Sequence, residues 1–578
     1  MKKVVILVLS ILTVTFAVNK NLTQVKTILV DDNKTITRTE LNSTSRFSPI
    51  NPLPSLPLIG RVEVIGYTTF DIQYNGPVYT HCRVDPVYGI HCYWLYSNFA
   101  PATDRNQRYN FYDFLTRTWL GDINVYTIRS GFGGMDYIPT GPYAGCAVAS
   151  THQTISAVIT PKIGRDIAPG AGLFEYTQAL GGYQWPAVGV TNNEAIHVAD
   201  MTAADYALWY TRCQPWGTWS TPVLIPDDLG TYPMFPDHNI AASKTSNKVV
   251  IMWVCANDVG QMRGFYKLSA DGGITWGTQT QIPFPPSTIA TPSFWITSLF
   301  GMFDNLDNLH IVADVSDGSN TLPAEIWHYC QINPQPWTLI HHFDAESIAA
   351  GVGSNALFAC RPSIVQAPGT TGNFYVAWEQ FDSLNYEPLT SLLRGEIWVA
   401  ELTNNGQTLT RKGRITDLNT TSKRTPCIGG VKNDTVFVQY LVDSIAGFAV
   451  AATPVGPVTN NPIILHRFHK NSLPVAIEEG NPTPKIYNFA LSSATPNPSN
   501  ITTKIAYSLP TISNVHLTIY DVLGRPIRTL VSGTKTPGEY SAIWDGRTNT
   551  GSKVQNGIYF YTLKSSDKSI SRKLIRTY

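Results

Sequence analysis

Six polar residues could bind or transform a ligand: five lie near prolines that recur along the chain, and Glu379 directly follows Trp378. The guanidinium of arginine pairs bidentately with a planar carboxylate, and a nearby glutamate or aspartate can serve as acid, base or counter-charge. If their segments converge, the six residues can bind a ligand that carries a carboxylate. These candidate ligand-binding residues are Arg83, Asp237, His238, Arg361, Glu379 and Arg424.

Other catalytic and metal-binding patterns are not found in the sequence. It has no G-x-S-x-G elbow, H-E-x-x-H motif, P-loop or dinucleotide-binding fingerprint. Asp304, Asp307, Asp314 and Asp317 do not have the spacing of a calcium-binding loop. We therefore expect no metal and no cofactor, and the sequence leaves open whether the chain is an enzyme.

The six candidates lie within residues 59–465, a region with a loose repeat. Each unit opens with a proline near the start of an apolar run, and a second apolar run follows, as in Asn247–Val254. A third run, rich in aromatic residues, often comes next. Strands and tight turns that repeat every 44–70 residues are typical of the blades of a β-propeller. The prolines are Pro77, Pro142, Pro186, Pro236, Pro292, Pro362 and Pro426.

The repeat predicts an all-β protein with a propeller of about seven blades, in a range of six to eight. A string of separate β-sandwiches is the alternative, but no obvious linker interrupts the region. In a propeller the inner strands of all blades begin at one face. We therefore expect the candidate residues beside the prolines to lie near that face.

The composition excludes several classes of protein. The 14% share of charged residues and the 11% share of aromatic residues are wrong for intrinsic disorder. The 43 glycines and 39 prolines punctuate turns and exclude a helical bundle. A net charge of +1 gives no reason to expect a nucleic-acid partner.

The N-terminus has the features of a signal peptide. Lys2 and Lys3 precede an apolar run that ends near Thr15-Phe16-Ala17, and we expect cleavage after Ala17. An uncleaved N-terminal anchor is the alternative, although the run is short for a membrane span. No second apolar run approaches spanning length, so we expect an exported chain without a transmembrane segment after cleavage.

Residues 488–578 read as a separate antiparallel β-sandwich. Apolar and polar residues alternate with period two between turns that contain glycine or asparagine. This segment has 11 basic and 4 acidic residues, whereas the rest of the chain after residue 17 has 29 basic and 37 acidic residues. We interpret the basic excess as a solvated face.

Two segments resemble known propellers. The segment from Ser269 to Trp276 resembles the Asp-box of sialidase-like propellers at every defining position, and in that family the box is a structural turn away from the active site. Residues 65–110 look like the opening of a group of exported bacterial propellers. The resemblance to sialidases implies an arginine cluster, a tyrosine nucleophile and carboxylates, but Arg361-Pro362-Ser363-Ile364 is only a partial echo of their Arg-Ile-Pro motif. The residues carried over as structural are Ser269, Asp271, Gly273 and Trp276.

The C-terminal segment resembles the sorting domain of the type IX secretion system, itself similar to the Ig-like domain of flagellar hook-capping proteins. The resemblance implies passage across an outer membrane through the secretion machinery, followed by release or attachment at the surface of a Gram-negative-type bacterium. A plain Ig-like accessory domain is the alternative. The landmarks that carry the resemblance are Pro496-Asn497-Pro498, Asp521-Val522-Leu523-Gly524, Trp544-Asp545-Gly546, Gly557-Ile558-Tyr559 and Lys573-Leu574-Ile575.

The eight cysteines and several tryptophans each have two interpretations. The cysteines could form disulfides in an oxidising compartment or serve as small buried residues. Trp216, Trp219, Trp327 and Trp337 could stack on sugars or peptides, but packing between blades is the preferred interpretation.

We expect a secreted or cell-surface propeller that binds an extracellular glycan or protein. A sialidase-like glycoside hydrolase and a structural or adhesive surface component are the alternatives. The predicted organisation is a signal peptide (1–17), an N-terminal linker or closing strand (18–58), a β-propeller (59–465), a linker (466–487) and a C-terminal secretion sorting domain (488–578).

Overall fold

The computed structural model shows an all-β protein. The chain consists of two compact units, Met1–Glu479 and Gly480–Tyr578. The predicted signal peptide lies outside the described residues, and so does the linker or closing strand except for Leu58. The structure describes residues 58–74, 78–98, 102–202, 204–227, 234–256, 262–287, 289, 294–317, 320–345, 348–353, 356–450, 454–476, 489–509, 513–535, 538–565 and 568–577.

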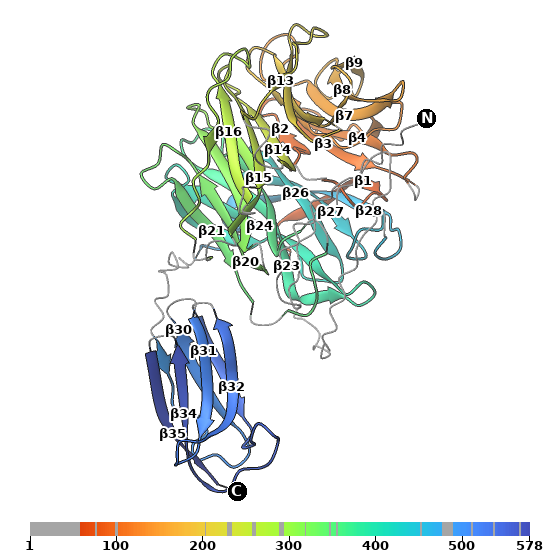
Figure 1. Cartoon of the computed structure of the whole chain (residues 1–578). Helices are drawn as coiled ribbons and strands as arrows, with labels where there is room; N and C mark the ends of the chain where they lie inside the picture. Colours follow the sequence, from red (N-terminus) through yellow and green to blue (C-terminus); the bar gives the residue numbers. More distant parts are fainter. Residues whose placement is uncertain are drawn as a thin grey trace, which may run out of the picture. The chain divides into compact units, whose positions relative to one another are not determined.

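Seven four-stranded antiparallel sheets form the propeller blades, which confirms the predicted fold (Figure 1). The strands of blades 1 to 3 are β2 (Cys82–Val84), β3 (Gly89–Tyr96), β4 (Asn106–Asp113) and β5 (Ile123–Asn124); β6 (Met135–Tyr137), β7 (Ala147–Ile155), β8 (Val158–Asp166) and β9 (Phe174–Gln178); and β10 (Tyr183–Val190), β11 (Ile196–Thr202), β12 (Leu208–Cys213) and β13 (Val223–Leu224).

The remaining blades follow the same pattern, except that blade 7 takes its outer strand from the start of the chain. They contain β14 (Met234–Ala242), β15 (Val249–Ala256), β16 (Met262–Ser269) and β17 (Thr280–Gln281); β18 (Phe294–Phe303), β19 (Leu309–Asp317), β20 (Asn320–Tyr329) and β21 (Trp337–Phe343); β22 (Ala359–Gln366), β23 (Phe374–Glu387), β24 (Leu392–Thr403) and β25 (Thr408–Arg414); and β26 (Ser422–Lys432), β27 (Thr435–Asp443), β28 (Asn461–His469) and β1 (Arg61–Thr68).

The blades close into a ring. Each inner strand contacts the inner strand of the next blade, and β26 of blade 7 contacts β2 of blade 1. β1 pairs antiparallel with β28, from Arg61 opposite Arg467 to Thr68 opposite Asn461. In Figure 1 the orange-red β1 runs beside the cyan β28. The ring therefore holds together through strands from both ends of the propeller sequence.

Packing on both sides of each blade explains the long apolar strands. In β15, Ile251 and Trp253 belong to one buried cluster, whereas Val250 and Met252 belong to another. Successive side chains of a strand point to opposite faces of the sheet. A blade that packs between two neighbours buries both faces, so its strands need apolar residues at odd and at even positions. The tryptophans fit this arrangement, because Trp327 and Trp337 are buried with their ring centroids 6.2 Å apart.

The connection that follows β1 has buried side chains in the core. Phe70, Ile72 and Tyr74 are buried and belong to the largest core cluster, which includes residues from several blades. Gln73 fixes the segment because its side chain accepts from the amide of Leu95 at 2.9 Å and donates to the Leu95 carbonyl at 2.9 Å. The described part of this connection is therefore built into the core that several blades share.

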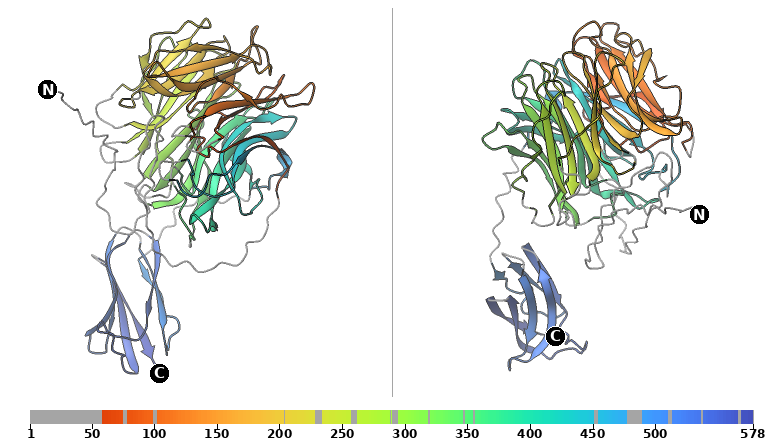
Figure 2. Two further views of the ribbon diagram at one scale, coloured as in Figure 1. Left: turned by 90° about the vertical axis from the view of Figure 1, so that its right-hand side faces the viewer. Right: turned by 45° about the horizontal axis from the view of Figure 1, so that its top comes forward.

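The C-terminal unit is a β-sandwich of two sheets with the strand orders β29-β30-β33 and β32-β31-β34-β35. Leu517 and Ile519 on β31 and Tyr561 and Leu563 on β34 are fully buried, as the period-two pattern predicts. Two further views show both units (Figure 2). The strands are β29 (Ala490–Leu491), β30 (Thr503–Leu509), β31 (Ser513–Tyr520), β32 (Pro526–Lys535), β33 (Gly538–Trp544), β34 (Gly557–Ser565) and β35 (Lys568–Arg576).

Among the described residues, no helix combines the length and the apolar character required to cross a bilayer.

Candidate functional site

Four of the recurrent prolines lie at irregularities of inner strands. Pairing with the second strand shifts around Pro186 in β10, Pro236 in β14, Pro362 in β22 and Pro426 in β26. Proline has no amide hydrogen for the ladder, so it is tolerated at a bulge. Pro142 instead lies in the turn between β6 and β7, and Pro77 and Pro292 lie outside the described residues.

The residue before the proline has an unusual backbone in three of these bulges. Trp185, Arg361 and Thr425 have φ angles of 57°, 55° and 56°. Residues other than glycine rarely adopt a positive φ angle. Each residue that does so lowers the stability of the fold by about 1–3 kcal/mol. The surrounding structure therefore holds these residues at the starts of the inner strands against a local preference. We call the face at which the inner strands begin the N-terminal face.

Glu379 lies between two of the candidate arginines. It is fully buried on β23, and its carboxylate accepts from Arg424 Nε and, at 2.8 Å, from the amide of Thr425. Arg361 Nη1 lies 3.4 Å from Glu379 Oε2. Arg361 and Arg424 retain only 7% and 3% of their exposure. Three of the six predicted residues thus form one buried ion cluster in which both carboxylate oxygens are occupied.

Two phenylalanines enclose the Arg424 guanidinium. Its Cζ lies 4.9 Å from the ring centroid of Phe381 and 5.1 Å from that of Phe448. A planar cation between aromatic rings gains cation–π attraction, most of all when desolvated. Arg424 Nη2 has no hydrogen-bond partner among the described residues. Arg424 is therefore well held but retains donor capacity.

Asp314 and Asp237 extend the polar cluster toward blades 4 and 5. Asp314 accepts from the amide of Arg361 at 2.9 Å and from that of Ser298 at 2.7 Å. Burial raises the pKa of Asp314, although these bonds oppose the rise. Burial, followed by the repulsion of Asp314, also raises the pKa of Asp237 well above its ordinary range. Asp237 Oδ1 has no hydrogen-bond partner among the described residues.

A second pair of carboxyl groups lies near Arg424. Asp71, on the connection between β1 and β2, accepts from the amide of Ala449 at 2.5 Å. Burial raises the pKa of Asp71 to about 7. Burial, followed by the charge of Asp71, raises the pKa of Asp443 well above its usual value. The two groups disfavour simultaneous ionisation, so the pair retains a proton near neutral pH.

The remaining candidates take part in other contacts. A nitrogen of His238, Nε2, lies 3.0 Å from the carbonyl of Trp185, and burial lowers the pKa of His238 to about 4, so its ring is neutral at pH 7. Arg83 Nε lies 3.6 Å from Asp136 Oδ1, and Lys244 lies 2.5 Å from the other oxygen of that carboxylate. Arg83 thus belongs to a different ion network from Arg361 and Arg424.

The eight-residue segment around Asp271 forms the turn between β16 and β17. Asp271 Oδ1 accepts from the amides of Ile274 at 3.1 Å and Thr275 at 2.9 Å, and Ser269 Oγ accepts from the amide of Gly273 at 2.8 Å. The ring of Trp276 packs edge-on against Tyr210 of the preceding blade, with centroids 4.8 Å apart. These contacts give the segment a structural role at the blade 3–blade 4 junction.

Half-buried aromatic rings occur at the N-terminal face. Tyr206 stacks on buried Trp185 with centroids 5.6 Å apart and an interplanar angle of 7°. Phe343 stacks on Phe358 at 6.0 Å and 17°. Tyr386, near the end of β23, is also half-buried. Each ring has an apolar surface supported by the core and partly open to solvent.

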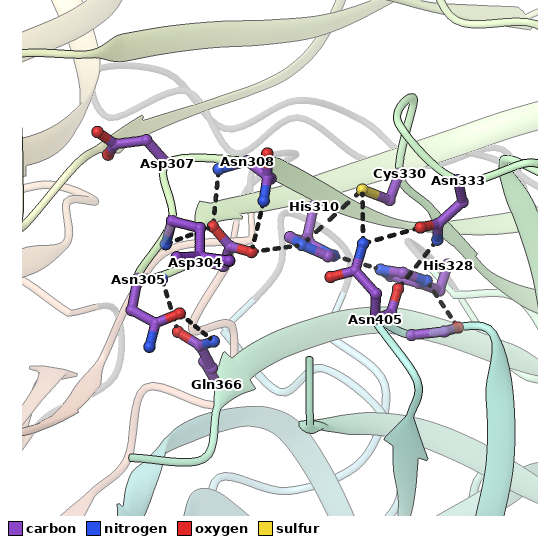
Figure 3. Close-up of polar contacts among 12 residues, drawn as sticks. Asp304, Asn305, Asp307, Asn308, His310, His328, Cys330, Asn333, Gln366 and Asn405 are labelled. Atoms are coloured by element: carbon purple, nitrogen blue, oxygen red, sulfur yellow. Dashed lines mark hydrogen bonds and ion pairs between the residues drawn. The ribbon is translucent and has the colours of Figure 1, made fainter. Parts of the chain in front are cut away.

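A second polar cluster lies in blade 5, where β18 ends (Figure 3). Asp304 follows β18 and accepts from the amide of Asn308 at 2.7 Å, and its Oδ2 lies 3.4 Å from His310 Nε2. His310 Nδ1 lies 2.9 Å from His328 Nε2, and His328 Nδ1 lies 3.1 Å from the carbonyl of Gly406 in blade 6. This chain of contacts connects two blades. In the described part of the chain, no group of three or more His, Cys, Asp or Glu residues could hold a metal ion.

Comparisons with known proteins identify the C-terminal unit. Residues 499–569 match the FlgD Ig-like domain. This Ig-like domain includes the strands from β30 to β34. No curated protein matches the chain.

Several solved structures similar to the chain are those of carbohydrate-active enzymes. The polysaccharide lyase Uly1 is 9% identical, with a TM-score of 0.44 over 69% of this chain and 92% of its own. A PL25 ulvan lyase is 10% identical, with a TM-score of 0.45 over 71% of this chain and 96% of its own. The NanB sialidase from Streptococcus pneumoniae is 11% identical, with a TM-score of 0.36 over 72% of both chains.

Sequence reasoning missed several members of the cluster near Arg424. Asp71 and Asp443 were not among the candidates, and Asp314 was considered only for calcium. One signal was available, because Asp71 and Asp314 interrupt apolar runs, "TTFDIQY" and "LHIVADV". A carboxylate within an apolar strand is almost never fully buried unless it has partners. Such positions therefore indicate a buried polar network.

Proposed function

We propose that the chain is an exported β-propeller that binds an extracellular glycan at the N-terminal face without cleaving it. The supporting observation is the internal pairing of Arg361, Glu379 and Arg424. Both oxygens of Glu379 are occupied, and all three side chains are buried. A hydrolase that captures a substrate carboxylate needs arginines that face the ligand. Here the two arginines already share one carboxylate.

The aromatic rings at the same face favour a glycan over a protein as the ligand. Sugar rings have apolar C–H faces and hydroxyl edges, and they suit sites that combine aromatic rings with a few fixed polar groups. Tyr206 and Phe343 each stack on a buried ring, so their orientation is fixed before a ligand arrives. A fixed aromatic ring loses little conformational entropy on binding.

Binding of the mature chain, residues 18–578, to a broad glycan array tests the proposal. We expect binding that weakens about two- to tenfold in Tyr206→Ala and Tyr386→Ala, since an aromatic stacking contact contributes about 0.5–1.5 kcal/mol. Tyr88→Ala is the matched control, because Tyr88 is also partly exposed but lies in the turn between β2 and β3, at the end of blade 1 opposite to the N-terminal face. Glycan binding that is unchanged in both test variants contradicts the proposed face. A blank array supports a protein ligand or a structural role.

A glycoside hydrolase is the second candidate, and Asp71 is the observation that favours it. A carboxyl group with a pKa of about 7 is protonated often enough at neutral pH to act as a general acid. Hydrolysis of fluorogenic sialosides and related glycosides by the same preparation tests this candidate. Turnover that is lost in Asp71→Asn and in Arg424→Met supports an enzyme and contradicts the binding-only proposal.

We further propose that the Ig-like domain directs the chain through the type IX secretion machinery to the cell surface or the medium. The ordered landmarks of residues 488–578 and the match to an Ig-like domain support this proposal. Removal of residues 488–578 should leave the propeller in the periplasm of the native host, detected by fractionation. Normal surface delivery of the truncated chain contradicts a sorting role.

A further inference from the structure

Cys82 and Cys92 lie directly opposite each other on the first two strands of blade 1. Cys82 on β2 pairs in register with Cys92 on β3. The amide of Tyr93 donates to the carbonyl of His81 at 2.8 Å, and the amide of Asp85 donates to the carbonyl of Gly89 at 2.9 Å. These bonds fix the alternation of the ladder, so Cys82 and Cys92 form a non-hydrogen-bonded pair. Such pairs have Cα atoms about 4.5 Å apart, within the range that a disulfide spans.

The two thiols face each other in the protein interior. Both cysteines are fully buried and belong to one hydrophobic cluster. A hydrogen bond with the thiol of Cys92, together with burial, raises the pKa of Cys82 well above its ordinary value. Gly429 of blade 7 makes room for the pair, because a Cβ atom there would lie 2.3 Å from Cys82 Sγ. All eight cysteines are free in this structure.

One further thiol lies close to the pair. Cys427 Sγ accepts from the amide of His81 at 3.3 Å and contacts the carbonyl of Cys82 at 3.8 Å. It comes from β26 of blade 7, so it does not share the cross-strand register of Cys82 and Cys92. It is the natural competitor for Cys82 during oxidation.

We propose that Cys82 and Cys92 form a cross-strand disulfide when the chain folds in an oxidising compartment. The proposal rests on export, the first part of the proposed function. The thiolate of one cysteine attacks a protein or small-molecule disulfide and forms a mixed disulfide, and the thiolate of the other cysteine then attacks this bond and displaces the oxidant's remaining sulfur as a thiolate. One S–S bond forms, two protons leave, and two electrons reduce the oxidant to two thiols. Because the pair is buried in the folded blade, the exchange takes place before the ring closes.

Peptide mapping tests the pair, since trypsin separates the three thiols. Cys82 lies in the peptide Val62–Arg83, Cys92 in Val84–Arg105 and Cys427 in Thr425–Lys432. The mature chain is refolded in a glutathione redox buffer, and a second sample is produced in a bacterial periplasm. Both samples are alkylated under denaturing conditions and digested without reduction. We expect Val62–Arg83 linked to Val84–Arg105, with the other six cysteines alkylated.

Two results would overturn the proposal. One is alkylation of all eight cysteines in both samples, and the other is a link between Val62–Arg83 and Thr425–Lys432. Cys92→Ser should abolish the link, whereas Cys330→Ser, also fully buried, should retain it. The chain can also be isolated from its native host and mapped in the same way. A link that forms in the refolded chain but is absent from the chain of the native host supports the proposed pairing of the cysteines and contradicts export.

Discussion

His310 and His328 lie ring against ring inside blade 5, with Nδ1 of His310 2.9 Å from Nε2 of His328 (Figure 3). His328 Nδ1 faces the carbonyl of Gly406 and must donate, so its Nε2 accepts. Burial, followed by the charge of His310, lowers the pKa of His328 to about 3, so this ring is neutral. His310 therefore donates from Nδ1, and its Nε2 faces a carboxylate oxygen of Asp304. His310 thus links His328 to Asp304 in one buried chain of contacts.

This pairing makes Asp304 important for stability. Although burial opposes ionisation, hydrogen bonds from His310 and Asn308 lower the pKa of Asp304 to about 2. Asp304→Asn removes the buried carboxylate that accepts from Asn308 and contacts His310, and we expect the free energy of unfolding to fall by about 1.5–3 kcal/mol. Urea unfolding followed by tryptophan fluorescence measures the change.

Asp307→Asn is the matched control for Asp304→Asn. Asp307 lies in the same turn but accepts from the hydroxyls of Ser243 and Thr245 nearer the surface. We expect it to cost less than about 1 kcal/mol. In the wild type, the contribution of Asp304 should be complete above about pH 4 and decline as the pH falls toward 2, because the folded pKa lies below the unfolded value. Equal costs for the two variants would mean that the contacts of Asp304 with His310 and Asn308 do not stabilise the fold.

Glu379→Gln tests the ion cluster near the N-terminal face. The variant keeps the shape of the side chain but removes the carboxylate charge that Arg361 and Arg424 share. We expect the free energy of unfolding to fall by about 3–5 kcal/mol. Glu401→Gln is the control, because Glu401 pairs with the more exposed Arg411 at 3.6 Å and should cost less than about 1 kcal/mol. Unfolding in guanidinium chloride, followed through the transition of the propeller, measures the stability of both variants. A cost for Glu379→Gln no larger than that of the control means that the cluster does not stabilise the fold.

Asp71 should give a pH dependence of the opposite sign to Asp304. Burial raises its folded pKa to about 7, above the unfolded value near 4. Its contribution to stability is therefore present below about pH 4 and is lost as the pH rises to 7, by up to about 1.4 kcal/mol per pH unit.

Asp71→Asn cannot ionise but still accepts from the amide of Ala449. We therefore expect it to be more stable than the wild type above about pH 7 and equal to it near pH 4. Unfolding free energies measured across this range provide the test. Asp271→Asn should behave oppositely, since hydrogen bonds from Thr275 lower the pKa of Asp271 to about 2. If the free energies of unfolding of the wild type and of Asp71→Asn change in parallel with pH, the raised pKa of Asp71 is contradicted.

The turn between β16 and β17 offers a pair of neighbouring glycines for comparison. Gly272 and Gly273 have φ angles of 77° and 78°. A Cβ on Gly273 would lie 1.7 Å from the hydroxyl of Tyr210, whereas the nearest atom to a Cβ on Gly272 is 3.9 Å away. We expect Gly272→Ala to cost about 1–2 kcal/mol from backbone strain alone. Gly273→Ala should cost clearly more, and thermal unfolding compares the two. Equal costs would mean that the contact with Tyr210 is unimportant.

The sequence predicts the propeller well because its signals are local and repeated. Apolar strands, turn residues and recurrent prolines occur in every unit, and blade packing requires both faces of the strands to be apolar. The role of the prolines was only partly predictable. Pro186, Pro362 and Pro426 lie at bulges of inner strands, whereas Pro142 lies in a turn. An X-Pro step alone does not distinguish a bulge from a turn.

The candidate site was less predictable because it depends on contacts between distant segments. The sequence indicated Arg361, Glu379 and Arg424 as separate candidates, and the structure brings them together. It could not show that the arginines neutralise one carboxylate, since that depends on how β23 faces the starts of β22 and β26. Asp71 contacts Ala449 from the far end of the propeller sequence, and no periodicity reports such a contact.

The pairing of β1 with β28 has a consequence for biosynthesis. β1 leaves the ribosome first among the propeller strands, but its partner is made only when the seventh blade is nearly complete. A shortened chain would leave unpaired strand edges at both sides of the gap, which are prone to aggregate. Because β1 needs β28 as its partner, the ring can close only when the whole propeller sequence has been made.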